Sequence, residues 1–185
     1  MTPLDPSVAL ILLAAGRSER FGGDKLTASF QGKPLWEWAA QAAEDAGFVR
    51  RYLVVGGHSS VGSRRGWQRV LNADAEQGMG TSIAAGVAAA ADHQRVVIAL
   101  ADMPNMRAGH LRRLAGSGGT VFTRQADGSA GTPAAFDKAS FARLRSLDGE
   151  RGARSLEFPD ARIVEPDSKA LLLDVDKPSD FPANN

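Results

Sequence analysis

No cysteine occurs among the 185 residues of this chain. Its absence excludes disulfide bonds, thiolate metal sites and cysteine nucleophiles together. Also absent is any run of 18 apolar residues, and the first ten residues, MTPLDPSVAL, carry an acid where a secretory signal carries basic residues. We therefore expect a cytoplasmic protein with no membrane partner.

An excess of charge of one sign is missing as well, since the formal net charge at pH 7 is +1. The basic residues are scattered or accompanied by glycine, without interleaved aromatic side chains, so nucleic acid is not an expected partner. The three histidines, His58, His93 and His110, show no spacing typical of metal ligands. We expect them at the surface or at caps.

What the sequence does contain is a regular alternation of strand and helix patterns. Its length suits one domain, residues 1–185, with roughly 70% of the unfolded surface buried on folding. Apolar runs predict strands at 8–13, 51–55, 68–71, 95–101, 120–123 and 133–136, with one or two more within 163–176. Helical spacing predicts helices at 34–46, 81–91, 107–115 and 137–147. This order indicates an α/β fold, a three-layer, doubly wound, mostly parallel sheet of Rossmann-like type. The turn-rich segment 116–133 is expected to precede a small substrate-facing extension.

The segment at 10–25, LILLAAGRSERFGGDK, follows a short buried strand with small residues and then with cations. Small residues let the backbone approach a ligand, and free amide groups at the carboxyl end of a strand suit phosphate oxygens. We predict a nucleoside triphosphate site, with a solvated basic loop as the alternative. The residues expected to hold the nucleotide here are Leu13, Ala14, Ala15, Gly16, Arg17 and Lys25.

The spacing of this loop distinguishes it from other phosphate loops. Lys25 follows Asp24 and precedes Leu26, so GxxxxGKS/T is absent, and GxGxxG is absent because arginine and serine follow Gly16. The remaining pattern, LAAG-R-S-x-R-F-G-x-x-K, resembles the opening signature of the MobA/MocA-like nucleotidyltransferases. Members of that family read LAAG or LAGG, then SxRMG, then a lysine.

A carboxylate, Asp102, stands directly after the buried strand at 95–101, in the sequence LADMP. Ligands bind at the carboxyl edge of open α/β sheets, and Mg²⁺ takes one or two carboxylates together with phosphate oxygens. Capping of the following helix is the alternative role for this residue. The motif resembles the family's DMP, whose aspartate binds the metal.

Two further acids, Asp174 and Asp176, occur in the sequence LDVDKP. Alternation in a strand would place both on one face, where a cation could share them, whereas a turn built on local Asp and Pro is the alternative. The stretch DVDKPSD looks like the family's D-I/V-D-T-P-E-D, with Lys177 in place of threonine and Ser179 in place of glutamate. The resemblance implies that Asp176 is the second metal ligand.

A glycine-rich turn leads into the second predicted helix. Its glycines and hydroxyl groups could serve a base, ribose or phosphate, while a plain loop with Thr81 or Ser82 as N-cap explains them equally well. The family's N-x5-G-M-x-x-S matches at Asn72, Gly78, Met79 and Ser82. The resemblance implies that Asn72, Gly78 and Ser82 contribute to nucleotide binding.

Two later motifs suit a second, anionic substrate. The chain reads Gly131-Thr132-Pro133 and then GERGAR at 149–154, where the family usually reads G-H/N-P and G-D-x-G-A-R. Thr132 and Glu150 depart from that pattern. The resemblance implies that Gly131, Pro133 and Arg154 bind the acceptor, and a turn glycine with a surface arginine is the alternative.

These matches run in the family's order along nearly the whole chain and are most similar to the molybdenum cofactor cytidylyltransferases. The resemblance implies transfer of CMP from CTP to the phosphate of molybdopterin with release of pyrophosphate, because LAAG accompanies CTP and LAGG accompanies GTP. It also implies Mg²⁺ held by Asp102 and Asp176, and Lys25, Arg17 and Asp102 as the catalytic residues. A molybdenum hydroxylase or its chaperone would be a further partner.

Other functions stay open on the sequence alone. The same chemistry could use GTP with molybdopterin, or CTP or UTP with a sugar or alcohol phosphate. Some similar sequences reduce a nicotine-derived pigment, although the missing GxGxxG argues against an NAD(P)H-dependent oxidoreductase. A non-catalytic nucleotide-binding module is the third alternative.

Overall fold

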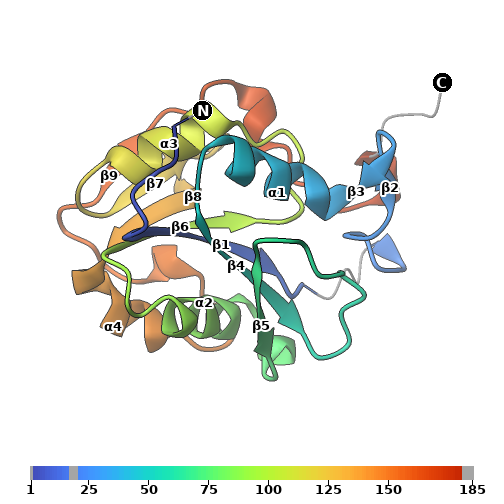
Figure 1. Ribbon diagram of the computed structural model, residues 1–185, viewed down its shortest axis with the longest axis horizontal. Helices are drawn as coiled ribbons and strands as arrows, with labels where there is room; N and C mark the ends of the chain where they lie inside the picture. The colour runs from blue at the N-terminus through green and yellow to red at the C-terminus, as the bar shows by residue number, and fades with distance from the viewer. Residues whose placement is uncertain (1, 17–20, 181–185) are drawn as a thin grey trace.

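The computed structural model describes residues 2–16 and 21–180 (Figure 1). In this part of the chain, a seven-stranded sheet lies between two layers of helices. Its strands are β1 (Val8–Ala14), β4 (Arg50–Gly56), β5 (Gln68–Asn72), β6 (Arg95–Leu100), β7 (Val121–Arg124), β8 (Ala130–Asp137) and β9 (Arg162–Val164). The α-helices are α1 (Leu35–Asp45), α2 (Met79–Ala89), α3 (Ala108–Gly116) and α4 (Phe141–Arg145). A second, two-stranded sheet consists of β2 (Ser29–Phe30) and β3 (Lys33–Pro34).

The main sheet has the strand order β5-β4-β1-β6-β8-β7-β9. The pairs β5–β4, β4–β1, β1–β6 and β7–β9 are parallel, whereas β8 runs antiparallel to both β6 and β7. The predicted α/β architecture with a mostly parallel, doubly wound sheet is confirmed. The segment 116–133 supplies β7 and the start of β8 to this sheet, and the small separate sheet is the β2–β3 hairpin.

Strand β1 is buried on both faces, as its unbroken apolar run predicts. Leu10 and Leu12 belong to the core beneath α1 and α3, whereas Ala9 and Ile11 belong to the core above α2 and α4. Successive strand residues point to opposite faces, so one segment supplies both cores. Because β1 lies between β4 and β6, its carboxyl end opens at the centre of the sheet, where ligands bind in folds of this kind.

Helix α2 begins earlier than its hydroxyl residues predict. It starts at Met79 with Gly78 at the N-cap, so the N-cap role expected of Thr81 or Ser82 is wrong. Thr81 Oγ1 lies 2.9 Å from the carbonyl oxygens of both Asp74 and Gly78. Gly78 has a φ of 122°, a conformation that excludes most other residues, and the chain can turn into the helix there.

The segment 163–176 contains less strand than predicted. Strand β9 ends at Val164, and the chain continues through a 3-10 helix, η5 (Lys169–Leu172), into an irregular stretch at 173–176. The expectation that Asp174 and Asp176 share one face of a strand is therefore wrong. The last predicted helix is also shorter, because 137–147 divides into η3 (Lys138–Ser140) and α4.

His110 is fully buried on α3, so its expected surface or capping position is wrong. Its Nε2 lies 2.8 Å from Thr123 Oγ1, and its Nδ1 lies 2.7 Å from a guanidinium nitrogen of Arg113. Polar partners on both ring nitrogens make burial of the imidazole tolerable.

Among the helices of the described segments, none is long and apolar enough to cross a bilayer.

Candidate active site

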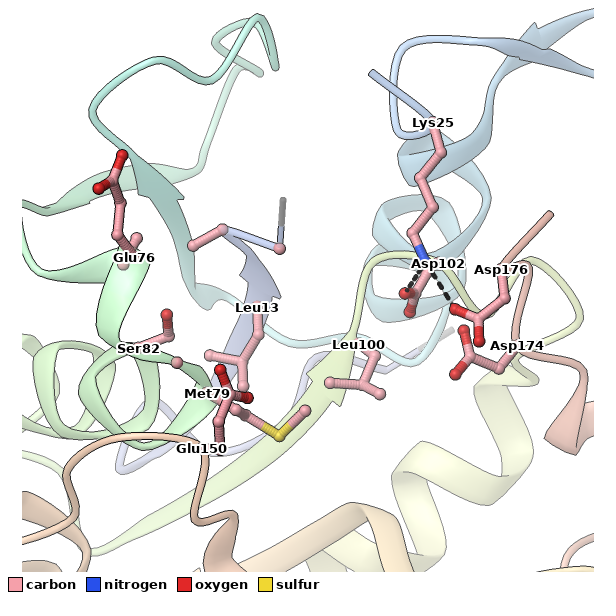
Figure 2. A pocket seen from close by; sticks show the side chains of 14 residues that line it. Leu13, Lys25, Glu76, Met79, Ser82, Leu100, Asp102, Glu150, Asp174 and Asp176 are labelled. Atoms are coloured by element: carbon pink, nitrogen blue, oxygen red, sulfur yellow. Dashed lines mark hydrogen bonds and ion pairs between the residues drawn. The ribbon is translucent and has the colours of Figure 1, made fainter. Parts of the chain in front are cut away.

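The backbone at 13–16 separates two cavities at the carboxyl end of β1, of about 390 Å³ and about 440 Å³. Leu13 lines the first cavity, Ala14 lines the second, and Ala15 and Gly16 line both. The loop predicted to hold a nucleotide is therefore accessible from two sides. Figure 2 shows the first cavity, with Glu76 and Ser82 on one side and Lys25 among three aspartates on the other.

The Lys25 side chain points into a group of carboxylates at one end of the first cavity (Figure 2). Its Nζ lies 2.8 Å from Asp102 Oδ2 and 3.3 Å from Asp176 Oδ1, and it donates to the carbonyl oxygen of Val175 at 2.7 Å. Only 7% of Lys25 is exposed. The predicted phosphate-binding lysine and the two predicted metal ligands are thus in direct contact.

Backbone hydrogen bonds, and not the alternation of a strand, bring Asp174 and Asp176 to this site. The N–H of Val175 donates to the carbonyl oxygen of Asp102 at 3.1 Å, which fixes the irregular stretch 173–176 at the end of β6. Asp180 Oδ2 accepts from the N–H groups of Asp176 and Lys177 at 2.9 and 2.8 Å. As a result Asp174 and Asp176 both line the cavity.

The charges at this end of the cavity perturb one another. Burial acts to lower the pKa of Lys25, but the nearby carboxylates, Asp102 foremost, outweigh it and raise that pKa above its ordinary value. Asp174 lines the cavity beside these groups; desolvation by the surrounding protein, followed by the charge of Asp102, raises the pKa of its carboxyl to about 7. Three acids therefore face one cation, and the group favours additional positive charge.

In the described part of the chain, these carboxylates do not by themselves form a complete metal-binding site. Across residues 2–16 and 21–180, no three potential metal ligands among His, Asp and Glu converge on one point. Asp102 Oδ1 is nonetheless buried and has no hydrogen-bond partner in the described part of the chain. A buried carboxylate oxygen normally has a partner, so this atom is a candidate ligand for a cation.

A further wall of the cavity is the loop at 148–151, which packs backbone to backbone against the turn before α2. The N–H of Gly80 donates to the carbonyl oxygen of Gly149 at 2.9 Å. A Cβ at Gly78 would lie 2.5 Å from the Gly149 carbonyl carbon, and one at Gly80 would lie 2.5 Å from the Asp148 carbonyl oxygen. Only glycines allow this approach, which brings Glu150 to the cavity.

Asn72 does not line either cavity but hydrogen-bonds to residues at the start of α2. It is 4% exposed, and its Nδ2 donates to Thr81 Oγ1 at 2.9 Å and to Ser82 Oγ at 3.0 Å. Its Oδ1 accepts from the N–H of Asp74 at 3.0 Å. Ser82 itself lines the first cavity, while nucleotide binding by Asn72 and by Ser82 stays a prediction.

The remaining predicted residues are not brought to these cavities. Arg17 lies outside the described residues. Gly131 and Pro133 lie in β8, and Arg154 is exposed on the 3-10 helix η4 (Ala153–Ser155); the walls of the two cavities include none of the three. Their roles in acceptor binding stay predictions.

Several cavity residues are not among those predicted. Met79 is itself a matched position of the motif before α2, and Glu150 stands where the chain departs from the family's G-D-x-G-A-R, so a signal was available for both. Glu76 and Leu100 also line the first cavity; Leu100 opens the LADMP sequence around Asp102, whereas no matched motif position marks Glu76. The fold alone brings Glu76 there.

A Rossmann-like sheet, a small-residue loop at the end of β1 and an adjacent cluster of lysine and aspartates together form a site suited to a nucleotide. The chain belongs to the family described as the MobA-like NTP transferase domain, which matches residues 10–162.

Two curated proteins illustrate the range of similar sequences. The purine catabolism protein PucB of Bacillus subtilis (strain 168) is 28% identical over 195 aligned residues, which cover 95% of each chain. Nicotine blue oxidoreductase of Paenarthrobacter nicotinovorans is 33% identical over 114 residues, covering 59% of this chain and 56% of that protein. Neither name refers to a molybdenum cofactor.

Among solved structures, that of Rv0371c from Mycobacterium tuberculosis H37Rv matches with a TM-score of 0.79 at 27% identity, covering 94% of this chain and 95% of that one. A second structure of Rv0371c, described as a complex with manganese, matches with a TM-score of 0.71 at 25% identity, over 87% and 88% of the two chains. A divalent metal accompanies this fold in at least that relative.

Proposed function

We propose that the protein transfers CMP from CTP to the phosphate of molybdopterin and releases pyrophosphate. The observation that carries this proposal is the contact of Lys25 with Asp102 and Asp176 in a cavity whose wall includes Leu13, Ala15 and Gly16. A cation next to carboxylates, beside exposed backbone at the carboxyl end of β1, suits a triphosphate with a divalent metal. The LAAG sequence, which accompanies CTP in similar proteins, supports the choice of nucleotide.

The reaction is an in-line displacement at the α-phosphorus. A phosphate oxygen of the acceptor forms the new bond to the α-phosphorus, the bond to the bridging oxygen of the β-phosphate breaks, and pyrophosphate leaves with that electron pair. An acceptor phosphate is already nucleophilic at neutral pH, so no general base is required. Lys25, cationic in this environment, would contact the phosphates and stabilise the charge that develops on them.

A divalent cation fits the residues present. Asp102 offers a buried oxygen without a hydrogen-bond partner, and Asp102 Oδ2 and Asp176 Oδ1 already share one positive charge. Carboxylate oxygens are the ligands that Mg²⁺ takes together with phosphates, so Asp102 and Asp176 would hold the ion. When bound, it would neutralise charge on the phosphate oxygens.

The experiment is Mg²⁺-dependent pyrophosphate release with CTP, GTP, UTP and ATP in turn, with and without molybdenum-loaded molybdopterin. The proposal expects release with CTP only when the cofactor is present, and none from the Asp102→Asn variant. Release with GTP would indicate a guanylyltransferase instead. If none of the four nucleotides released pyrophosphate with this acceptor, the acceptor assignment would be wrong. Sugar and alcohol phosphates would then be tested as acceptors.

The partial similarity to nicotine blue oxidoreductase supports a second candidate, reduction of a pigment. Oxidation of NADH or NADPH in the presence of a quinonoid dye would reveal that activity. Binding of CTP without pyrophosphate release in the presence of any acceptor would favour a nucleotide-binding module.

A further inference from the structure

The Lys25 ammonium has surroundings typical of a bound cation. Three oxygens lie within 3.3 Å of Nζ: Asp102 Oδ2, Asp176 Oδ1 and the carbonyl oxygen of Val175. The two carboxylate oxygens come from segments far apart in the chain, and the lysine side chain between them is 9% exposed. The ammonium is therefore the charge that joins the two acids.

Those acids are the ones proposed above to hold the divalent cation. A metal ion bound to Asp102 Oδ2 and Asp176 Oδ1 would lie within a few ångströms of the present ammonium position. Two like charges at that separation repel strongly in a partly buried site. The ammonium and the metal therefore cannot both occupy the space between these carboxylates.

We propose that Lys25 occupies the divalent-cation position in the nucleotide-free protein and excludes the metal until a nucleoside triphosphate draws the ammonium away. This inference rests on the proposed function, because it needs the same site to accept a triphosphate. Lysine suits such an exchange, since its charge sits on a flexible stem of four carbons with three rotatable donors. The phosphates offer the ammonium new acceptors at the moment that the metal takes its place.

Asp102 keeps acceptor capacity for the metal beside the ammonium. Its Oδ1 is buried without a hydrogen-bond partner in the described part of the chain, so the ammonium does not use every oxygen that the acids offer. A divalent ion takes several oxygen ligands, and the phosphate oxygens of a triphosphate would add to those of Asp102 and Asp176.

The test is binding of Mn²⁺ alone, measured by electron paramagnetic resonance of the free ion, with no nucleotide present. The variants are Lys25→Met, which keeps the stem and removes the charge, and Lys177→Met as the matched control. Lys177 is exposed and directly follows Asp176, so its loss removes the same charge nearby without vacating the position between the acids. Circular dichroism spectra verify that both variants are folded.

We expect Lys25→Met to bind Mn²⁺ at least tenfold more tightly than the unaltered protein, and Lys177→Met to differ from it by less than threefold. Calorimetry with a non-hydrolysable CTP analogue should then show that Mn²⁺ strengthens nucleotide binding to the unaltered protein. Equal Mn²⁺ affinity of the unaltered and Lys25→Met proteins would overturn the inference while leaving the transferase proposal intact. If neither protein bound Mn²⁺, even with the analogue, the metal site itself would be wrong.

Discussion

The Lys25–Asp102 contact unites the two residues on which the proposed chemistry depends most. Asp102→Asn should abolish pyrophosphate release, because an amide cannot supply the second negative oxygen. Its backbone carbonyl still accepts from Val175, so the fold should persist. Lys25→Ala should lower kcat by a factor of about 10² or more, the scale seen when a group that stabilises developing charge is removed. Steady-state kinetics with CTP measures both.

Full activity of Asp102→Asn would contradict the metal assignment. A change of KM alone in Lys25→Ala would make Lys25 a binding residue that does not favour the transition state. Lys177→Ala serves as the control for a charge lost near the same acids.

The hydrogen bonds around the buried His110 determine which of its ring nitrogens carries the proton. Thr123 donates its hydroxyl proton to the carbonyl oxygen of Pro133 at 2.5 Å, so His110 Nε2 must donate to Thr123 and Nδ1 must accept from Arg113. The ring is therefore neutral. Burial, and then the charge of Arg113, lower the pKa of His110 from 6.5 to about 4.

Because the unfolded state takes up this proton more readily, folding stability should fall as pH decreases from about 6.5 to about 4. The loss attributable to the ring is on the order of 3 kcal/mol. In His110→Gln, which keeps one donor and one acceptor, this pH dependence should disappear. Urea unfolding at pH 7 and pH 4.5 tests it, with His58→Gln as an exposed control. An unchanged pH slope in His110→Gln would refute the assignment.

The turn before α2 and the loop at 148–151 are held together by close backbone contacts. Gly80→Ala would place a Cβ 2.5 Å from the Asp148 carbonyl oxygen and 2.8 Å from that of Arg151. Backbone atoms cannot move aside as a flexible side chain can, so we expect a loss of about 1–3 kcal/mol and a raised KM, as Glu150 leaves its position. Thermal unfolding and kinetics measure the two effects.

Gly116→Ala is the matched control, since a Cβ there meets no atom within 4 Å. It should leave both stability and KM nearly unchanged. If Gly80→Ala behaved like this control, the loop would not depend on the close backbone contact.

Nucleotide binding should stabilise the whole fold, because the site joins segments from both ends of the chain, such as those of Lys25 and Asp176. At a concentration of 100 times Kd, a ligand specific for the native state contributes about 2.7 kcal/mol. For a chain of this size we expect Tm to rise by about 5–10 °C with CTP and Mg²⁺. Differential scanning fluorimetry measures the shift.

Asp102→Asn should show a much smaller shift under the same conditions. A rise in Tm with CTP that is equally large in this variant would place the nucleotide elsewhere. The same assay with ATP, GTP and UTP ranks the four nucleotides by affinity independently of catalysis.

Sequence patterns predicted most of the strands and helices and pointed to the carboxyl end of β1, where the two cavities lie. A continuous apolar run must be buried on both faces, which identified β1 and β6, and the residue that follows such a strand must lie at the carboxyl edge of the sheet. Leu13, Gly16 and Asp102 line the first cavity, and they were predictable there because they stand at or just after the carboxyl ends of these strands.

The contacts between distant segments of the chain, by contrast, arise from tertiary packing. Lys25 contacts Val175 over 150 positions of sequence, and an irregular segment, in which the Val175 N–H donates to the carbonyl oxygen of Asp102, brings Asp176 to the same lysine. The antiparallel insertion of β8 and the placement of Glu150 have the same origin. Local patterns specify backbone conformation and burial, but contacts between distant segments depend on how the folded elements pack, so no spacing along the chain could show them.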